Sequence, residues 1–442
     1  MKKLRKRLSS FQIILLGFAG VILIGALILM LPISTKERIV TPFIDAIFTS
    51  TSAVCVTGLI VFDTATHWSI FGQVVIITLI QIGGIGVITI AVSFALLFKK
   101  KIGLSSRGTL KEAISAEDFG GVLRLMGFIL KGIFLIEFLG AVIMLPVFCR
   151  DFGPKGIWYA FFHSISAFCN AGFDLMGTPE NKFQSLTSYA TNPVINLTVC
   201  FLILIGGIGF LVWDDIIKHK WRIKKYRMQS KAVLLVSLII TLFPTIYFFI
   251  FEFGDMSFGD RLLASFFQAV TPRTAGFNTV DLTMLKEVSI ALMIILMMIG
   301  GSSGSTAGGM KMTTVSVLFA SALSVFRKKD STEMLKRRID DDTVKTASAI
   351  MILYLVLFLV GGMTISLIED LPLLTCLYES ASAVATVGLT LGITSTLSIA
   401  SKIILIVSMY FGRVGAMTLI YATVGSSQKN LSKYPIDKIS VG

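Results

Sequence analysis

Charged residues, histidine and cysteine are all scarce in this sequence. Charged residues make up 15% of the 442 positions, and there are three histidines and five cysteines. So little charge could not cover a water-soluble surface, whereas a hydrophobic content of 54% is typical of a protein with many membrane spans. The cysteines form no CxxC pair, so we expect free thiols and neither a disulfide framework nor a zinc site. The histidines are scattered and no paired carboxylates stand out, so we expect no enzyme active site.

The basic residues are concentrated in a few places, although the net charge is +14. The segments 2–7, 99–111, 218–231, 327–345 and 429–438 contain 27 of the 40 lysines and arginines. An even number of spans between these segments would put all of them on one side, and positive charge marks that side as cytoplasmic. We therefore expect a multi-pass protein of the plasma membrane with both termini in the cytoplasm. The charge indicates topology and some contact with anionic membrane lipid, not nucleic-acid binding.

A glycine with similar neighbours recurs four times along the chain. Ten positions before each glycine is an aromatic residue, directly after it is a bulky apolar residue, and small residues rich in hydroxyls lie between. Each segment is too short to cross a bilayer and lies between long apolar stretches. Non-helical backbone at membrane depth is tolerated only where it lines a cavity or is sheltered by protein. The four glycines are Gly58, Gly172, Gly276 and Gly388.

This pattern predicts an all-α polytopic membrane protein. Four repeats of helix, pore helix and helix would surround one central pore with pseudo-four-fold symmetry, giving about eight full spans. The expected repeats are residues 1–98, 99–217, 218–326 and 327–442, the last with a C-terminal tail. The expected spans are residues 11–31, 70–98, 122–147, 193–213, 231–252, 288–326 (interrupted), 346–368 and 400–424. The expected pore helices are residues 42–54, 157–168, 259–271 and 372–384.

The loops around the four glycines suit a cation-selective filter. A cation that sheds its water needs replacement oxygens, which rings of backbone carbonyls provide in potassium channels. Glycine permits the unusual dihedral angles that turn a carbonyl toward a pore. The pore helices would direct the negative ends of their dipoles at the same point, and the lack of an acidic ring favours monovalent ions. The predicted K⁺-binding filter comprises Val56, Thr57, Gly58, Asn170, Ala171, Gly172, Thr274, Ala275, Gly276, Thr386, Val387 and Gly388.

The segments QAVTPRTAGFNT around Gly276 and TVGL around Gly388, with the four pore repeats, resemble the superfamily of Trk, Ktr and HKT potassium transporters. The length and the ending YPIDKISVG are most similar to the membrane subunits of bacterial Ktr systems, KtrB and KtrD, and the resemblance covers essentially the whole chain. It implies potassium uptake across the cell membrane. In that family, glycine in all four filters accompanies potassium preference, and serine in the first filter accompanies sodium. All four are glycine here.

The glycine-rich segment GGSSGSTAGGMKM interrupts the expected span 288–326. It lacks the G-K-[ST] ending of a phosphate-binding loop. A helix seam of small residues that pack closely is one interpretation. A flexible plug under the filter is the other, because five glycines in ten residues unwind a helix and Lys311 follows, and the resemblance implies such an intramembrane gate. The predicted gate comprises Gly300, Gly301, Ser302, Ser303, Gly304, Ser305, Thr306, Ala307, Gly308, Gly309, Lys311 and Arg413.

Arg413 lies inside the last span, where a charge is costly and usually faces a cavity or a partner. It is either a structural arginine or an electrostatic and positioning group at the pore. The resemblance favours the second role, because the family has an arginine here beside its gating loop. Asp45, His163 and Glu379 in the pore helices suggest hydrogen bonding behind the filter, and Arg273 could cap filter carbonyls. The motif IGGIG, which occurs after the first and second filters, suggests close packing of spans.

Partners follow partly from what the sequence lacks. We find no soluble nucleotide-binding domain in it, so nucleotide control would come from another polypeptide. The resemblance implies a homodimer above a cytoplasmic Ktr-type regulatory ring that binds ATP or ADP, with the tail of residues 432–442 at the dimer interface. We expect no cofactor on this chain, K⁺ as substrate and Na⁺ as a further candidate ion. The alternative functions are a sodium-coupled potassium symporter and a less selective transporter of K⁺ and Na⁺.

Overall fold

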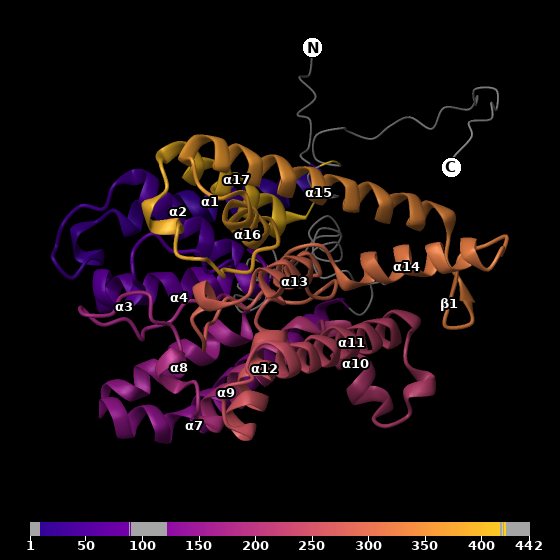
Figure 1. Cartoon of the computed structure of the whole chain (residues 1–442), viewed down its shortest axis with the longest axis horizontal. Helices are drawn as coiled ribbons and strands as arrows, with labels where there is room; N and C mark the ends of the chain where they lie inside the picture. The colour runs from indigo at the N-terminus through magenta and orange to yellow at the C-terminus, as the bar shows by residue number, and fades with distance from the viewer. Residues whose placement is uncertain (1–8, 88, 90–121, 416–417, 419, 421–442) are drawn as a thin grey trace, which may run out of the picture.

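The computed structural model describes residues 9–87, 89, 122–415, 418 and 420. These residues are almost entirely helical, apart from a short antiparallel hairpin of β1 (Glu333–Met334) and β2 (Arg337–Arg338), so the all-α prediction is confirmed. Helix α3 (Thr64–His67) lies at the left-hand end of the molecule in Figure 1, and the hairpin lies at the right-hand end. The expected boundary at residues 98 and 99, the segment 99–111 and the tail of residues 432–442 lie outside the described residues.

The same order of helices occurs four times. Each group has a long first helix, a short pore helix and a second helix. The first helices are α1 (Ser10–Leu29), α7 (Val122–Phe152), α11 (Met228–Phe251) and α15 (Asp341–Glu369). The pore helices are α2 (Phe43–Cys55), α8 (Lys155–Phe168), α12 (Phe258–Val270) and α16 (Leu373–Val384), close to the expected ranges. The second helices are α4 (Ile70–Ile85), α9 (Pro193–Gly207) followed by α10 (Phe210–His219), α13 (Glu287–Met298) followed by α14 (Met312–Phe326), and α17 (Ile399–Val414).

Short 3₁₀ helices occur in the connections, mostly between a pore helix and the second helix of the same group. They are η1 (Pro32–Ser34), η2 (Thr187–Tyr189), η3 (Ile223–Lys225), η4 (Leu282–Met284) and η5 (Thr394–Thr396).

The second helices are shorter than the expected spans, and the one within residues 288–326 is interrupted, as expected. Among the described residues, four helices are long and apolar enough to cross a membrane, namely α1, α7, α11 and α15, and the bent pair α9–α10 could add a fifth. We expected about eight. The difference arises because the second helices are short or broken: α9 and α10 meet at an angle of 95°, and a loop separates α13 from α14.

Glycine is the physical cause of three of these breaks. Gly86, Gly209 and Gly415, which follow α4, α9 and α17, have φ of 96°, 91° and 87°, a region that favours glycine. A glycine three positions earlier fits against a pore helix: a Cβ on Gly83 would lie 2.0 Å from the carbonyl oxygen of Val54. Gly206 and Gly412 make equivalent approaches to pore helices. The IGGIG motif therefore has two functions, since its first glycine permits close packing, as expected, and its last glycine ends the helix.

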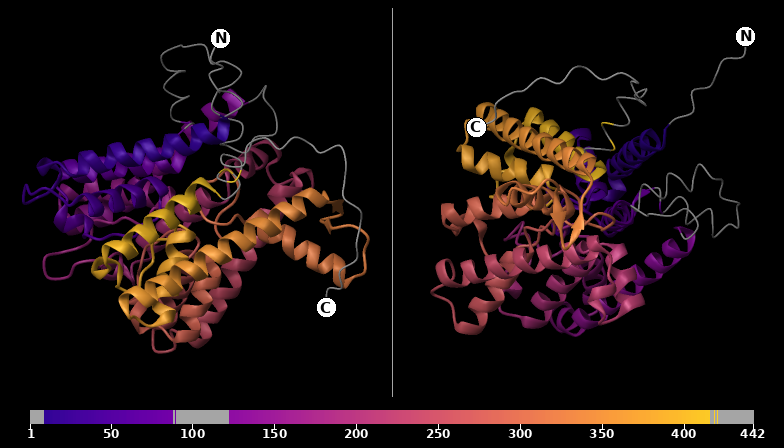
Figure 2. Two further views of the ribbon diagram at one scale, coloured as in Figure 1. Left: turned by 90° about the horizontal axis from the view of Figure 1, so that it is seen from above. Right: turned by 90° about the vertical axis from the view of Figure 1, so that its right-hand side faces the viewer.

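The four groups form a closed ring. The second helix of each group packs on the pore helix of the next, through the pairs α4–α8, α9–α12, α13–α16 and α17–α2. The last pair brings the two ends of the described chain together, as the indigo and yellow helices in Figures 1 and 2 show. Lys402 of α17 donates to the carboxylate of Asp45 of α2 at 2.8 Å, and both side chains are largely buried. This ion pair joins the fourth group to the first.

The outer faces of the first helices are apolar and exposed. On α11, for example, Leu235, Leu238, Leu242 and Phe243 are all exposed, whereas the hydroxyl-rich pore helices are buried. An exterior of large aliphatic and aromatic side chains is typical of a surface that faces lipid. The pore helices and the loops that follow them therefore lie in the protected centre of the molecule.

Candidate functional site

The four filter loops have the same unusual backbone. The residue two positions before each glycine has a left-handed conformation, with φ of 57° at Val56, 60° at Asn170, 67° at Thr274 and 53° at Thr386. The glycines themselves have φ of 99°, 69°, 81° and 92° in chain order. Positive φ is uncommon in residues other than glycine and costs about 1–3 kcal/mol where it is strained. Four copies of the same turn, in sequences that otherwise differ, indicate a site whose geometry matters.

The four glycines meet at one point and form a ring with the carbonyls that precede them. A Cβ on Gly58 would lie 2.5 Å from the carbonyl oxygen of Ala171. The same contact is 2.7 Å between Gly172 and Ala275, 2.5 Å between Gly276 and Val387, and 2.2 Å between Gly388 and Thr57. Each loop thus presents a carbonyl to the glycine of the next loop around the ring. No side chain larger than hydrogen fits at these four positions without a shift.

Hydroxyl groups at the ends of the pore helices hold the loops. The backbone N–H groups of Gly58 and Gly388 donate to Ser52 Oγ and Ser382 Oγ, each at 3.0 Å. In the other two loops the hydroxyl donates instead, from Ser166 to Phe173 O at 2.7 Å and from Thr271 to Phe277 O at 2.6 Å. Sequence reasoning noted that these segments are rich in hydroxyls but assigned them no role. A hydroxyl-bearing residue stands five or six positions before each filter glycine, and this regular spacing could have indicated that it holds the loop.

The pore helices end directly at this ring. Their last residues precede the filter glycines by three to six positions, so the C-terminal end of each pore helix lies close in sequence to the ring. A helix C-terminus carries a partial negative charge of about half an elementary charge. Four such ends, with four loop carbonyls and no acidic side chain within the loops, form a centre that attracts a cation.

A small cavity of about 100 Å³ lies on one side of the ring. It is lined by the four glycines together with Asp174, Asn278 and Thr390. The carboxylate of the buried Asp174 accepts a hydrogen bond from the backbone N–H of Met176 at 3.0 Å. The pKa of Asp174 is raised to about 7, chiefly by burial and also by the nearby Asp63 carboxylate, although the hydrogen bonds from Met176 and Ser185 lower it. Asp174 therefore places a titratable negative charge at this mouth of the ring.

The titration of Asp174 gives a pH-dependent prediction. Below pH 7 the carboxyl is protonated and above pH 7 it is charged, so cation uptake should rise as the pH on this side increases from 6 to 8. The attraction between one carboxylate charge and a cation a few ångströms away in water is ~1 kcal/mol, which corresponds to a change of about fivefold in uptake. The variant Asp174→Asn should show low uptake and no such rise, whereas Asp255→Asn, which removes an exposed charge elsewhere, should behave as the native chain. A pH dependence that survives in Asp174→Asn would contradict this assignment.

On the other side of the ring lies the gate loop, which we define as residues 299–311 between α13 and α14. Its stem is held by backbone hydrogen bonds from Gly300 N to Met310 O at 2.8 Å and from Met312 N to Gly301 O at 3.0 Å. Next to this stem the loop contacts the fourth filter: a Cβ on Gly308 would lie 2.1 Å from Thr386 Oγ1, and one on Gly309 would lie 2.7 Å from Ala385 O.

A larger cavity of about 330 Å³ lies beyond the gate loop. Gly309, Lys311 and Arg413 line it, together with parts of α1 and α17. Residues of the gate loop thus contact the fourth filter loop and also line this cavity, which we call the inner cavity.

Two cations hold the gate loop without acidic partners. Lys311 Nζ donates to Ala307 O at 2.8 Å and to Gly308 O at 3.3 Å, so it closes the loop on itself. The guanidinium of Arg413 donates to Thr306 O and to the carbonyls of Gly83 at 2.5 Å and Gly84 at 3.1 Å. Within the part of the chain that the structure describes, neither cation has an ion pair. Arg413 thus ties the gate loop to the end of α4.

The other predicted residues are at the back of the filter. Asp45 forms the ion pair with Lys402, and Glu379 accepts hydrogen bonds from the hydroxyls of Thr390, at 2.8 Å, and Thr394. His163 Nε2 lies 3.3 Å from the backbone nitrogen of Leu175, which donates to it. These contacts fit the hydrogen-bonding role that the sequence suggested.

Arg273 differs from the expectation. It does not cap the filter carbonyls, because its guanidinium points away from the ring and donates to the hydroxyls of Thr241 at 2.7 Å and Ser237 at 2.8 Å on α11. Only its backbone carbonyl faces a filter loop, where it accepts from Asn170 Nδ2 at 3.4 Å. A buried guanidinium needs several acceptors, and two hydroxyls on the neighbouring helix provide them.

The fold and the ring of carbonyls define a membrane protein that transports cations. The chain belongs to the TrkH family of cation transport proteins, whose model matches residues 9–434. It is 41% identical to the potassium/sodium uptake protein NtpJ of Enterococcus hirae, over 100% of this chain and 99% of the relative. It is 39% identical to the Ktr system potassium uptake protein B of Bacillus subtilis, over 99% and 97% of the two chains. These relatives confirm the resemblance to Ktr and Trk proteins.

A solved structure confirms the fold. The potassium transporter TrkH of Vibrio parahaemolyticus superposes with a TM-score of 0.75, covering 96% of this chain and 86% of the other. At 19% sequence identity this similarity concerns the fold alone.

Proposed function

We propose that this protein takes up potassium across the plasma membrane and is not an enzyme. The observation that carries the proposal is the ring in which Gly58, Gly172, Gly276 and Gly388 each lie against a carbonyl of the next loop. Such a ring can replace the water around a monovalent cation. The filter is formed by the three residues that end at each glycine, and K⁺ is the substrate, with no cofactor on this chain.

The gate loop and Arg413 control passage in this proposal. The loop occupies the space between the ring and the inner cavity, and its five glycines allow it to move when its few hydrogen bonds are broken. The ends of the chain and the basic linkers lie in the cytoplasm, so the cavity beside Asp174 faces the outside.

We assign the control of uptake by a nucleotide to a separate partner protein. Two relatives are named as parts of a Ktr system, which supports a partner subunit for this chain. In our proposal that partner is a cytoplasmic ring that binds ATP or ADP, and it lies below a homodimer of this chain. The basic linker 218–231 and the hairpin of β1 and β2 are on the side where such a ring would lie.

A less selective transporter of K⁺ and Na⁺ is the second candidate, and the name of the Enterococcus relative favours it. The four glycines favour potassium, since no filter carries the serine that accompanies sodium in this family. Coupling of potassium uptake to a sodium gradient is a third possibility that the same experiment separates.

The test is uptake of rubidium, as a tracer for potassium, and of sodium into liposomes that contain the purified chain. We expect rubidium to enter in clear preference to sodium and without a sodium gradient. Equal rates for the two ions would favour the less selective transporter, and a requirement for a sodium gradient would favour a symporter. If a correctly folded, monodisperse preparation takes up neither ion, the proposal is wrong.

A further inference from the structure

The second helix of the second group bends sharply between α9 and α10. The axis changes by 95° at Gly209, so α10 lies nearly perpendicular to the helix that precedes it. The basic segment 218–231 begins at the end of α10. In Figure 1, α10 lies beside α11 toward the right-hand end. We call α10 and the following residues to Tyr226 the surface arm.

The surface arm is connected directly to the gate loop. Phe210 N, at the first residue of α10, donates to Gly304 O at 2.7 Å. On the other side of the bend, Ser302 N donates to Gly207 O at 2.9 Å and Thr306 N donates to Gly206 O at 3.3 Å. Three backbone hydrogen bonds therefore join the gate loop to the two sides of the bend. A change in the angle of α10 must alter at least one of them.

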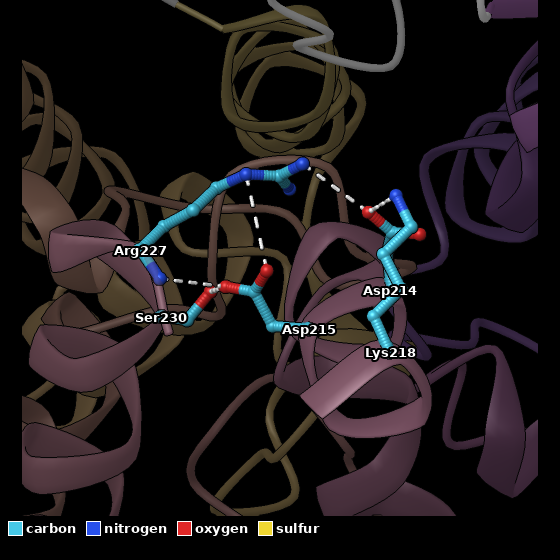
Figure 3. Close-up of polar contacts among 5 residues, drawn as sticks. All are labelled: Asp214, Asp215, Lys218, Arg227 and Ser230. Atoms are coloured by element: carbon cyan, nitrogen blue, oxygen red, sulfur yellow. Dashed lines mark hydrogen bonds and ion pairs between the residues drawn. The ribbon is translucent and has the colours of Figure 1, made fainter. Parts of the chain in front are cut away.

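A polar cluster fixes the surface arm to α11, as Figure 3 shows. The buried carboxylate of Asp215 accepts from Arg227 N at 2.9 Å and from Ser230 Oγ at 2.6 Å. Asp214 accepts from Arg227 at 3.2 Å and from Lys218 at 2.8 Å. These contacts neutralise both acidic residues of α10 and hold one face of the helix against the protein. The surface arm is therefore attached to the start of α11 by its two acidic residues.

The opposite face of the surface arm is apolar and has no partner within the described residues. Trp221 is 95% exposed, Ile217 60% and Ile223 58%. These side chains border a hollow of about 580 Å³ that Tyr226 and Leu234 complete. Large apolar groups are stable at such exposure when they enter the interface of a bilayer, where tryptophan is enriched.

The charge on the same face identifies the occupant. Residues 216–226 include five basic residues and no acidic one. Lys218 is paired with Asp214, whereas Lys220, Arg222, Lys224 and Lys225 have no ion pair among the described residues. These residues follow α10 in a turn and the short helix η3. A segment with exposed apolar side chains and unpaired basic residues fits anionic lipid, because the apolar groups can enter the acyl region while the cations meet the headgroups.

We propose that anionic lipid of the cytoplasmic leaflet binds the surface arm and thereby sets the position of the gate loop. The inference deepens the proposed function and rests on it for the side of the membrane and for the role of the loop. Lipid that holds α10 against the surface fixes the bend at Gly209, and the three backbone hydrogen bonds transmit this position to residues 302–306.

The binding step is tested by tryptophan fluorescence in liposomes, with no need for transport. The probe is brominated phosphatidylglycerol, an anionic lipid, compared with brominated phosphatidylcholine, and the signal of Trp221 is the difference between the native chain and Trp221→Phe. We expect the anionic lipid to quench Trp221 with at least about fivefold preference, as several basic residues at an anionic surface should give. Replacing Lys220, Arg222, Lys224 and Lys225 with glutamine should remove the preference.

A matched control changes the same number of charges elsewhere. Arg327, Lys328, Lys336 and Arg337 are exposed basic residues near the hairpin, and their glutamine variants should keep the preference. Equal quenching by the two lipids, or the same loss in both quadruple variants, would overturn the proposal. So would a Trp221 that neither lipid quenches, because a second copy of the chain or another protein would then cover the surface arm.

The coupling step is tested by rubidium uptake in liposomes with and without phosphatidylglycerol. Uptake by the native chain should change at least about threefold with the anionic lipid, and the surface-arm variant should lose this response while the hairpin variant keeps it. Selective quenching with unchanged uptake would overturn the connection to the gate loop. If no preparation takes up rubidium, the proposed function fails, and the quenching still decides whether the surface arm binds anionic lipid.

Discussion

Replacing Gly58 with serine should abolish the preference for rubidium over sodium. Gly58 has a φ of 99°, and any Cβ would lie 2.5 Å from Ala171 O and 3.2 Å from the Cα of Gly388. The ring must therefore widen or twist to accept the side chain, and the serine hydroxyl adds a ligand of different geometry. Strain of about 1–3 kcal/mol at one site of the ring corresponds to a loss of about fivefold or more in the uptake ratio of the two ions. The measurement is uptake of both ions into liposomes.

Gly392 provides a matched control for this substitution. It has nearly the same backbone conformation, with a φ of 93°, but nothing lies within 4 Å of an added Cβ. Gly392→Ser, in the connection that follows the fourth filter, therefore introduces a similar backbone cost without contacting the ring. We expect it to leave the rubidium preference unchanged. If Gly58→Ser transports well and keeps its preference, or if both variants lose it equally, the ring is not the selectivity filter.

Deleting residues 301–309 should raise rubidium uptake. The structure favours this deletion because Gly300 N and Met310 O are already 2.8 Å apart, so the shortened chain can join where the stem is now closed. The deletion removes the part of the gate loop that contacts Ala385 and Thr386 beneath the ring. If the open state is a minor one, populated at ~0.1–10%, a permanently open route raises uptake at least about tenfold. The sodium-to-rubidium ratio should stay as in the native chain, because the filter is intact.

Arg413→Ala is a milder test of the same idea. It removes the hydrogen bonds from the guanidinium to Thr306 and to the end of α4, and leaves every residue of the gate loop in place. We expect an increase in uptake smaller than that of the deletion, with unchanged expression and thermal stability of the purified protein within a few degrees. A gate assignment is wrong if both variants are stable and take up rubidium at the native rate or below it.

The sequence was most informative where the signal was local and repeated. An aromatic residue, a run of small and hydroxyl-bearing residues and a glycine occur together within a dozen positions in each filter segment, so Gly58 and its three equivalents could be aligned without knowledge of the fold. The pore helices followed from the same alignment. The break at residues 300–309 was also visible, because five glycines cannot continue a helix.

Contacts between distant segments could not be predicted in the same way. The ion pair of Asp45 and Lys402 joins residues 357 positions apart, and nothing in either neighbourhood identifies the partner. Arg273 is beside a filter loop in sequence, yet its side chain points to α11. Its position in the sequence does not determine whether the side chain points toward the ring or toward a neighbouring helix. The bend at Gly209 was missed because a glycine motif within an apolar run fits close packing as well as it fits a break.

The gate loop comes from the third repeat and contacts the filter loop of the fourth. A pore made of four identical subunits would carry every such loop four times at its axis, where even one added methyl on Gly308 has no room beside Thr386. Because the four repeats are joined in a single polypeptide, only one of them has to carry the loop. Three repeats can keep a continuous or bent second helix while the other evolves a loop at the axis. Substitutions in residues 299–311 then need no compensating change in the other three repeats.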